Sequence, residues 1–253
     1  MIKIIGGKLK RSNLFVLNNL VRPTSAMKRE AIFSILESYA LKNSIDLYNK
    51  KSAIDLFAGS GSLGIEAISR GISKVFFYEN NSKVLDTLET NCKKIIKKKN
   101  YQIIKADIMR VTIRKNELPV SLIFIDPPYK KYDIESILEN IVTNNILENY
   151  SIIILETEKN EIVKLNKSLQ VFKKKTFGKT LQRTYYYNLR IFSHFFSRRF
   201  EAPVTSNLSR SLSSSSAISA KVQVWFGGFG IGLERHCREK WLRFSTRSTG
   251  RPS

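Results

Sequence analysis

Short apolar runs alternate with amphipathic stretches along residues 1–190, and this pattern predicts the order of secondary structure. Each run is four to six residues long, which is typical of strands buried on both faces of a parallel sheet. The predicted strands cover residues 53–57, 74–79, 101–105, 122–125 and 152–155, followed by a closing antiparallel pair at 170–174 and 184–189.

Apolar residues at helical spacing fall between these runs. In the first such segment Leu63, Ala67 and Ile68 share one side, and Gly71 follows as a stop signal. The predicted helices cover residues 62–70, 82–99 and 134–140. Strand and helix in series predict an α/β fold with a doubly wound sheet.

The composition supports a folded core and excludes several classes of protein. Hydrophobic residues make up 42% of the 253 residues, which is enough to fill an interior. No apolar run approaches the roughly 18 residues that span a bilayer, and the first residues lack a secretory signal. Cys92 and Cys237 give neither a disulfide framework nor a metal cluster. We expect a soluble, cytoplasmic protein with no membrane partner and no metal.

The net charge is strongly positive. The chain carries 43 basic and 21 acidic residues, a formal charge of +22. Such a field favours nucleic acid, through phosphate contacts and counterion release. A compositional bias toward lysine, isoleucine and asparagine explains the same number, so the charge alone does not choose between the two interpretations.

The last 63 residues differ from the rest of the chain. Residues 191–253 hold 13 Ser and 8 Arg but 3 Ile and 1 Asn, and the stretch 206–219 shows no apolar period. We predict a folded unit over 1–190 and a basic Ser/Arg-rich tail that is disordered or foreign to it. A basic RNA-binding extension is the alternative for the tail.

The first chemical motif follows the first predicted strand. Gly59, Gly61 and Gly64 satisfy G-x-G-x-x-G at a strand-to-helix turn, where missing side chains let a cofactor approach the backbone. The pattern alone suggests a dinucleotide dehydrogenase, or simply a tight turn. Asp55 precedes the loop, and its carboxylate would repel a pyrophosphate but attract an ammonium and a sulfonium. The motif therefore favours S-adenosylmethionine.

Further acidic residues lie at or just after the ends of the next two strands. Glu79 is positioned to accept hydrogen bonds from ribose hydroxyls. Asp107 could meet the adenine amine, although a helix N-cap explains it equally well. The candidate cofactor-binding residues are Asp55, Phe57, Gly59, Gly61, Glu79 and Asp107.

The second motif is Asp126-Pro127-Pro128-Tyr129, directly after the apolar run 122–125. Doubly wound sheets bind ligands at this end of their strands. Asp126 and the Pro127 carbonyl can each accept an N–H bond from an exocyclic base amine and so aim its lone pair at a methyl group. Tyr129 would stack on a base taken out of its helix. The alternative is a proline-rich turn with Asp126 as a helix N-cap, but the residue types and their location favour the amine site.

With both motifs the chain resembles the amino-directed N-methyltransferases. The segments Ile4-Ile5-Gly6-Gly7-Lys8 and Arg22-Pro23-Thr24 to Arg29-Glu30 narrow the resemblance to the RsmD family. This family methylates N2 of a guanine in bacterial 16S ribosomal RNA, at the family's guanine-966 site. The resemblance covers about residues 1–190, including 177–179 and 185–187, and stops before the tail.

The resemblance implies a fold, a partner and a mechanism. The fold is the Rossmann-like sheet of class I S-adenosylmethionine-dependent methyltransferases, with core 51–190 and an RNA-facing N-terminal extension, 1–50. The partner is 16S rRNA in an assembling 30S subunit. Methyl transfer is direct and in line, without a metal or covalent intermediate. Asp126 acts as a hydrogen-bond acceptor more than as a strong base, because an unperturbed carboxylate has a pKa of about 3.9.

The resemblance also implies an RNA-binding surface. The candidates are Lys3, Lys8, Lys10, Arg11, Arg22, Thr24 and Arg29. A surface ion pair with Glu30 is an equally good interpretation of Arg29, and a lysine-coated surface explains the others. The rival functions are a DNA adenine-N6 methyltransferase, a non-catalytic RNA-binding protein and a nucleotide-dependent dehydrogenase.

Overall fold

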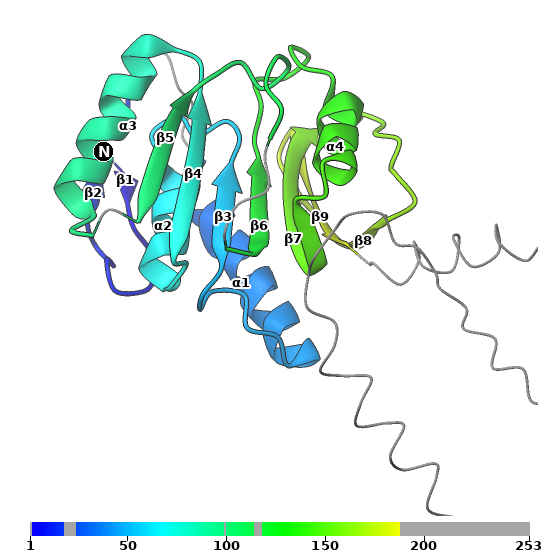
Figure 1. The fold of residues 1–253 in the computed structure, drawn as a ribbon, viewed down its shortest axis with the longest axis horizontal. Coiled ribbons are helices and arrows are strands. Elements are labelled where there is room, and N and C mark those ends of the chain that lie inside the picture. The colour runs from blue at the N-terminus through cyan, green and yellow to red at the C-terminus, as the bar shows by residue number, and fades with distance from the viewer. Residues whose placement is uncertain (1, 18–23, 99, 114–117, 188–253) are drawn as a thin grey trace, which may run out of the picture. The chain divides into compact units, whose positions relative to one another are not determined.

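A seven-stranded sheet forms the centre of the protein (Figure 1). The computed structural model describes residues 2–17, 24–98, 100–113 and 118–187. The strands lie in the order β5-β4-β3-β6-β7-β9-β8. Their bounds are β3 Ser52–Asp55, β4 Lys74–Glu79, β5 Tyr101–Lys105, β6 Val120–Ile125, β7 Leu147–Glu158, β8 Leu169–Phe177 and β9 Thr180–Tyr187.

The first five strands of the sheet are parallel, and β9 runs antiparallel between β7 and β8. The chain winds outward from β3 through β4 to β5, then returns to pair β6 with the other side of β3. This reversal is a topological switch point, where loops from neighbouring strands diverge and leave room for a ligand. The predicted doubly wound sheet is confirmed.

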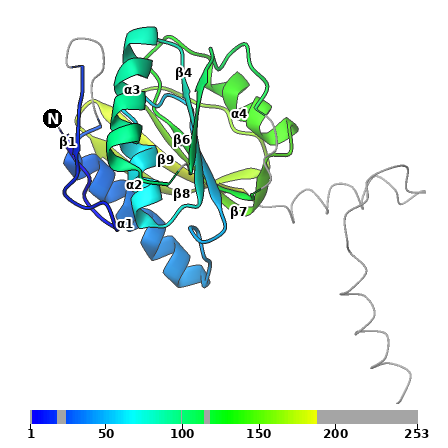
Figure 2. The same cartoon turned by 60° about the vertical axis from the view of Figure 1, so that its left-hand side comes forward.

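Helices cover both faces of the sheet. α1 Ala26–Asn43, α2 Ser62–Arg70 and α3 Ser82–Ile95 pack on one face, and α4 Ile134–Thr143 packs on the other (Figure 2). Phe33 and Leu36 of α1 join one core, while Ile137 and Ile141 of α4 join the second. Alternate residues of the buried strands supply both cores, as a sheet covered on two sides requires.

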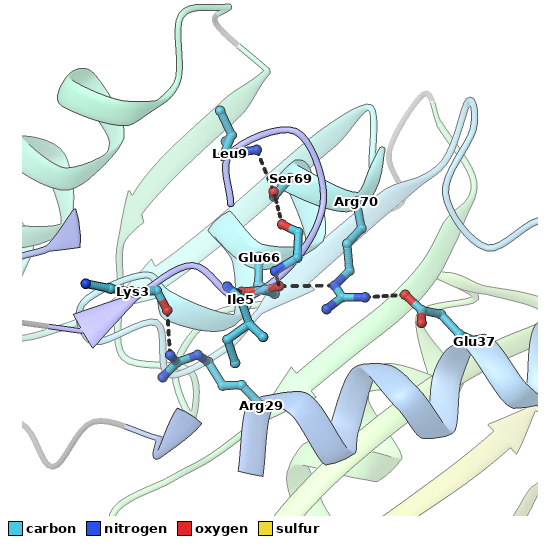
Figure 3. A network of polar contacts seen from close by, with 9 residues as sticks. Lys3, Ile5, Leu9, Arg29, Glu37, Glu66, Ser69 and Arg70 are labelled. Atoms are coloured by element: carbon cyan, nitrogen blue, oxygen red, sulfur yellow. Dashed lines mark hydrogen bonds and ion pairs between the residues drawn. The ribbon is translucent and has the colours of Figure 1, made fainter. Parts of the chain in front are cut away.

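A small N-terminal hairpin is docked on α2. It consists of β1 Ile2–Lys3 and β2 Asn13–Leu14. The fully buried Glu66 of α2 accepts hydrogen bonds from the Ile5 and Gly6 amides at 2.8 and 2.7 Å and from Arg70 Nε at 3.1 Å (Figure 3). One carboxylate thus satisfies buried backbone donors of the N-terminal segment.

The predicted elements differ from the observed ones mainly at their ends. The strand predicted over 53–57 ends at Asp55, because Leu56 and Phe57 begin the turn into the glycine loop. The helix predicted over 82–99 ends at Ile95, before its last lysines. The hairpin and α1 were not predicted. The tail 191–253, Arg22 and Cys237 lie outside the described residues.

None of the helices in the described part of the chain is both long and apolar enough to cross a membrane.

Candidate active site

A cavity of about 520 Å³ opens at the carboxyl ends of β3, β4 and β6. It is lined by the glycine loop, the Asp126–Tyr129 segment, the end of β4 and the residues around Thr24. Its volume falls in the range of small-molecule sites, roughly 300–1,000 Å³. The two motifs that the sequence singles out therefore lie on one cavity.

The glycine loop has a conformation that side chains would oppose. Gly59 and Gly61 have φ of 54° and 81°, in the left-handed region. A Cβ on Gly64 would lie 2.2 Å from the Phe77 ring, so this glycine lets α2 pack closely against β4. Gly59 lines the cavity, whereas Gly61 supports the turn beneath it.

Asp55 lies behind the glycine loop. It is 2% exposed and does not line the cavity. Its Oδ2 accepts a hydrogen bond from the Gly64 amide at 3.1 Å, which ties β3 to the first turn of α2. Burial raises the pKa of Asp55 to about 7, although the bond from Gly64 opposes the shift. In this structure Asp55 braces the loop, and its contact with a cofactor stays a prediction.

Glu79 lines the cavity beside the glycine loop. Its Oε2 accepts a hydrogen bond from the Gly59 amide at 3.0 Å. Its Oε1 accepts bonds from the Asn80 and Asn81 amides, both at 2.9 Å. Glu79 therefore fixes the glycine loop relative to the end of β4 and presents its carboxylate at the cavity wall.

Phe57 and Asp107 have different environments. Phe57 lines the cavity and meets the Tyr132 ring edge-on, with centroids 4.8 Å apart. Asp107 does not line the cavity, and its Oδ1 accepts a hydrogen bond from the Met109 amide at 3.1 Å. The residues after Asp107 form a turn instead of a helix, so the helix N-cap considered for it is wrong.

Asp126 meets the N-terminal segment in the cavity. Its Oδ2 accepts a hydrogen bond from the Thr24 hydroxyl at 2.9 Å. Burial and the nearby Glu156 carboxylate raise the pKa of Asp126 to about 7, while Thr24 and Lys28 oppose the shift. Thr24 is 9% exposed and shapes the site from inside. Pro127, Pro128 and Tyr129 line the same cavity.

The sequence analysis missed three residues that line the cavity, namely Glu156, Lys28 and Tyr132. Glu156 is 6% exposed, and its Oε1 accepts a hydrogen bond from the Tyr129 hydroxyl at 3.0 Å. The same oxygen forms an ion pair with Lys28 Nζ. A signal for Glu156 was present, since it follows the buried run 152–155 as Asp55 and Glu79 end theirs. Tyr132 and Lys28 carried no comparable pattern.

The basic candidates divide into exposed and buried residues. The side chains of Lys3, Lys8, Lys10 and Arg11 are exposed on the N-terminal hairpin. Arg29 is 0% exposed, and its guanidinium donates hydrogen bonds to the carbonyls of Thr24 and Lys3. The expectation that Arg29 contacts RNA is therefore wrong for this conformation, as is the surface ion pair.

Arg29 instead joins α1 to the hairpin (Figure 3). Burial lowers its pKa from the usual value, with Glu66 opposing the shift. Within the described residues no three His, Cys, Asp or Glu side chains are grouped to hold a metal ion.

Comparisons of sequence identify relatives over most of the described chain. A family model described as Conserved hypothetical protein 95 matches residues 2–186. Ribosomal RNA small subunit methyltransferase D of Buchnera aphidicola is 34% identical over 176 residues, covering 69% of this chain and 87% of that protein. The protein of the same name from Haemophilus influenzae is 30% identical over 187 residues, covering 73% and 93%.

Comparison with solved structures also identifies methyltransferases. A solved structure of the Escherichia coli protein YhhF, described as a methyltransferase, has a TM-score of 0.63 and 26% identity. The match covers 74% of this chain and 98% of that one. The fold is thus the Rossmann-like sheet of the class I methyltransferases. Since the family model also spans the hairpin, the core and the closing strands, the chain belongs to the RsmD family of methyltransferases.

Proposed function

We propose that this protein transfers a methyl group from S-adenosylmethionine to the exocyclic N2 amine of a guanine in 16S rRNA. The observation that carries the proposal is one cavity that joins the glycine loop to Asp126–Tyr129. Relatives named ribosomal RNA small subunit methyltransferase D support rRNA as the substrate. The guanine-966 position and the assembling 30S particle follow from the family resemblance.

The loop side of the cavity fits S-adenosylmethionine. Gly59 leaves the backbone open to a ligand, and Glu79 offers a carboxylate to ribose hydroxyls. Phe57 supplies an aromatic wall beside them. Asp55 holds the loop in place from behind. When bound, the cofactor supplies an electrophilic methyl group on a sulfonium.

The other side of the cavity fits a nucleobase amine. The Asp126 carboxylate would accept a hydrogen bond from one N–H of the amine, and the Pro127 carbonyl would accept one from the other. These two bonds would turn the nitrogen lone pair toward the methyl donor. Tyr129 would stack on the base, with its hydroxyl anchored on Glu156. Orientation and desolvation of the two reactants would supply most of the acceleration.

The raised pKa of Asp126 changes its expected role. Its unperturbed value suggested an acceptor that could not hold a proton near neutral pH. With a pKa of about 7, the Asp126 carboxylate can take the proton that the methylated amine releases. Asp126 therefore first accepts a hydrogen bond from the amine and then acts as a general base that takes its proton.

The test compares substrates and one isosteric variant. Purified protein is incubated with labelled S-adenosylmethionine in three separate reactions. Their substrates are 30S particles lacking the modification, free 16S RNA and DNA. We expect label on ribosomal RNA and loss of that label in Asp126→Asn, while cofactor binding by calorimetry persists. Transfer only to DNA would instead support the adenine-N6 methyltransferase alternative.

A further inference from the structure

A second cavity lies outside the candidate active site. It has a volume of about 800 Å³, larger than the cavity that holds Asp126. Residues of α1 line one side of it, and residues of β8 and β9 line the other. We call it the α1–β8 groove and define it by Tyr39, Lys42, Phe172, Lys173, Lys175 and Tyr186.

Three aromatic rings form a cluster in this groove. The Tyr39 and Phe172 rings have centroids 4.4 Å apart and planes inclined by 33°. The Tyr186 ring lies 6.1 Å from Tyr39 and 6.2 Å from Phe172. All three residues are half-buried, so part of each remains accessible from the groove. Tyr150, which is 41% exposed, adds a fourth aromatic residue to the lining.

The groove is positively charged at its rim. Lys42, Lys173 and Lys175 are all exposed, and Glu30 is the one acidic residue among the described lining residues. Cations for phosphates beside aromatic faces for bases are the combination that binds single-stranded nucleic acid. Lysines on an edge strand also prevent strand pairing, but that role does not explain the clustered rings.

One aromatic ring connects the groove with the active site. Lys28 Nζ lies 5.9 Å from the centre of the Phe177 ring, and Lys175 Nζ lies 5.4 Å from the same centre. Lys28 lines the candidate active site, whereas Lys175 lines the groove. Along α1, the eleven helical steps from Lys28 to Tyr39 span about 16 Å, a distance that a few nucleotides can cover.

We propose that the α1–β8 groove binds an unpaired segment of the RNA substrate next to the target nucleotide. Bases stack on the Tyr39–Phe172–Tyr186 cluster, and Lys42, Lys173 and Lys175 contact phosphates. The proposal rests on the proposed function, because the RNA in the groove is the strand whose base enters the cavity at Asp126.

A charge variant tests the phosphate contacts. Lys173→Gln/Lys175→Gln removes two exposed cations and should leave the fold intact. We expect the KM for unmodified 30S particles to rise about threefold to tenfold, with kcat and cofactor affinity unchanged. The plot of log affinity against log salt concentration should become less steep by about 1.4, because each lost phosphate contact with a single strand reduces the steepness by roughly 0.7.

The matched control removes the same charge elsewhere. Lys97 and Lys98 are exposed beyond the end of α3, away from both cavities. Lys97→Gln/Lys98→Gln should change the KM by less than twofold. An equal rise in the two double variants would reduce the effect to net charge and overturn the groove as a binding site.

A ring variant tests stacking by direct binding. Phe172→Leu should weaken binding of a labelled single-stranded RNA 12-mer about fivefold or more, while thermal stability and cofactor binding report an intact fold. Wild-type affinity in Phe172→Leu together with wild-type KM in the lysine pair would overturn the proposal. Self-association that both variants abolish would also overturn it, because a second copy would then fill the groove.

The experiments distinguish a wrong proposed function from a wrong assignment of the groove. If the wild-type protein transfers no methyl group to RNA, the function is wrong, and binding of the 12-mer still tests the groove. If methyl transfer is normal and both groove variants match the wild type, the groove alone is wrong.

Discussion

Asp126 and Glu156 are acidic residues of the same cavity, held in place by neighbouring donors. Thr24 donates a hydrogen bond to Asp126, whereas Tyr129 and Lys28 both bind Glu156. Burial and the nearby negative charge of Glu156 raise the pKa of Asp126. The pH dependence of the reaction should therefore reveal this pair.

The methyl-transfer rate should fall as the pH drops below about 7. The carboxylate form of Asp126 is needed to accept the amine N–H, and protonation removes that acceptor. Glu156→Gln removes a negative charge that raises the pKa of Asp126, so the acid limb should move to lower pH. Single-turnover rates from pH 5 to 9 measure both effects. An acid limb at the same pH in both proteins would contradict the coupling.

Asp126→Asn should lower kcat about 100-fold or more, the usual contribution of a positioned acid or base. The asparagine oxygen can still accept the Thr24 hydroxyl bond, so the fold should persist. Affinity for RNA by filter binding should change less than threefold. A variant with nearly full kcat would show that Asp126 is not a catalytic residue.

Asp55 should reduce stability near neutral pH. Its raised pKa means that the folded protein binds more protons than the unfolded chain between about pH 4 and 7, so this group lowers stability as the pH rises. Asp55→Asn should therefore increase the free energy of unfolding by ~1–4 kcal/mol at pH 8. The gain should vanish near pH 4, as measured by urea unfolding without cofactor. Equal destabilisation at both pH values would contradict this account.

At the scale of elements, the succession of strands and helices from residue 53 onward and the two motifs could be predicted from the sequence, while the hairpin and α1 could not. Buried parallel strands can be predicted because each is a short apolar run, such as 122–125. α1 packs through Ile32, Phe33 and Leu36, but polar and apolar residues mix around it, so its periodicity is weak. β1 and β2 have two residues each and depend on tertiary contacts.

Dependence on tertiary contacts also explains which site residues the sequence analysis missed. Lys28 and Glu156 are 128 residues apart in the chain and meet only after folding. Arg29 was assigned to RNA from the family resemblance of its segment, yet it is buried, and the carbonyls of Thr24 and Lys3 accept hydrogen bonds from its guanidinium. A resemblance over a short segment does not separate a structural arginine from a surface one.

The docking of the hairpin on α2 makes a prediction at this scale. Glu66→Gln places an amide group among the Ile5, Gly6 and Arg70 donors and should destabilise the protein by ~2–4 kcal/mol. Limited proteolysis should then cut within residues 2–17. Glu37→Gln is the control, because the Glu37 side chain is 51% exposed and also pairs with Arg70. It should cost less than ~1 kcal/mol. Equal effects in both variants would contradict the role of Glu66.

At the scale of the whole molecule, the RsmD family match ends at residue 186, and the composition changes after residue 190. The tail therefore stays outside the account of the site. Deletion of residues 191–253 should leave the thermal midpoint and the methylation rate within experimental error. A clear loss of either would contradict the prediction that the tail is not part of the folded, active unit.

The central claim is that the two motifs on one cavity methylate a guanine amine of 16S rRNA. The most direct measurement incubates the protein with S-adenosylmethionine and unmodified 30S particles, then identifies the modified nucleoside by mass spectrometry and its position by RNase mapping. The account predicts N2-methylguanosine at a single position, absent with Asp126→Asn. A methyl group on another base, or on ribose, would contradict it.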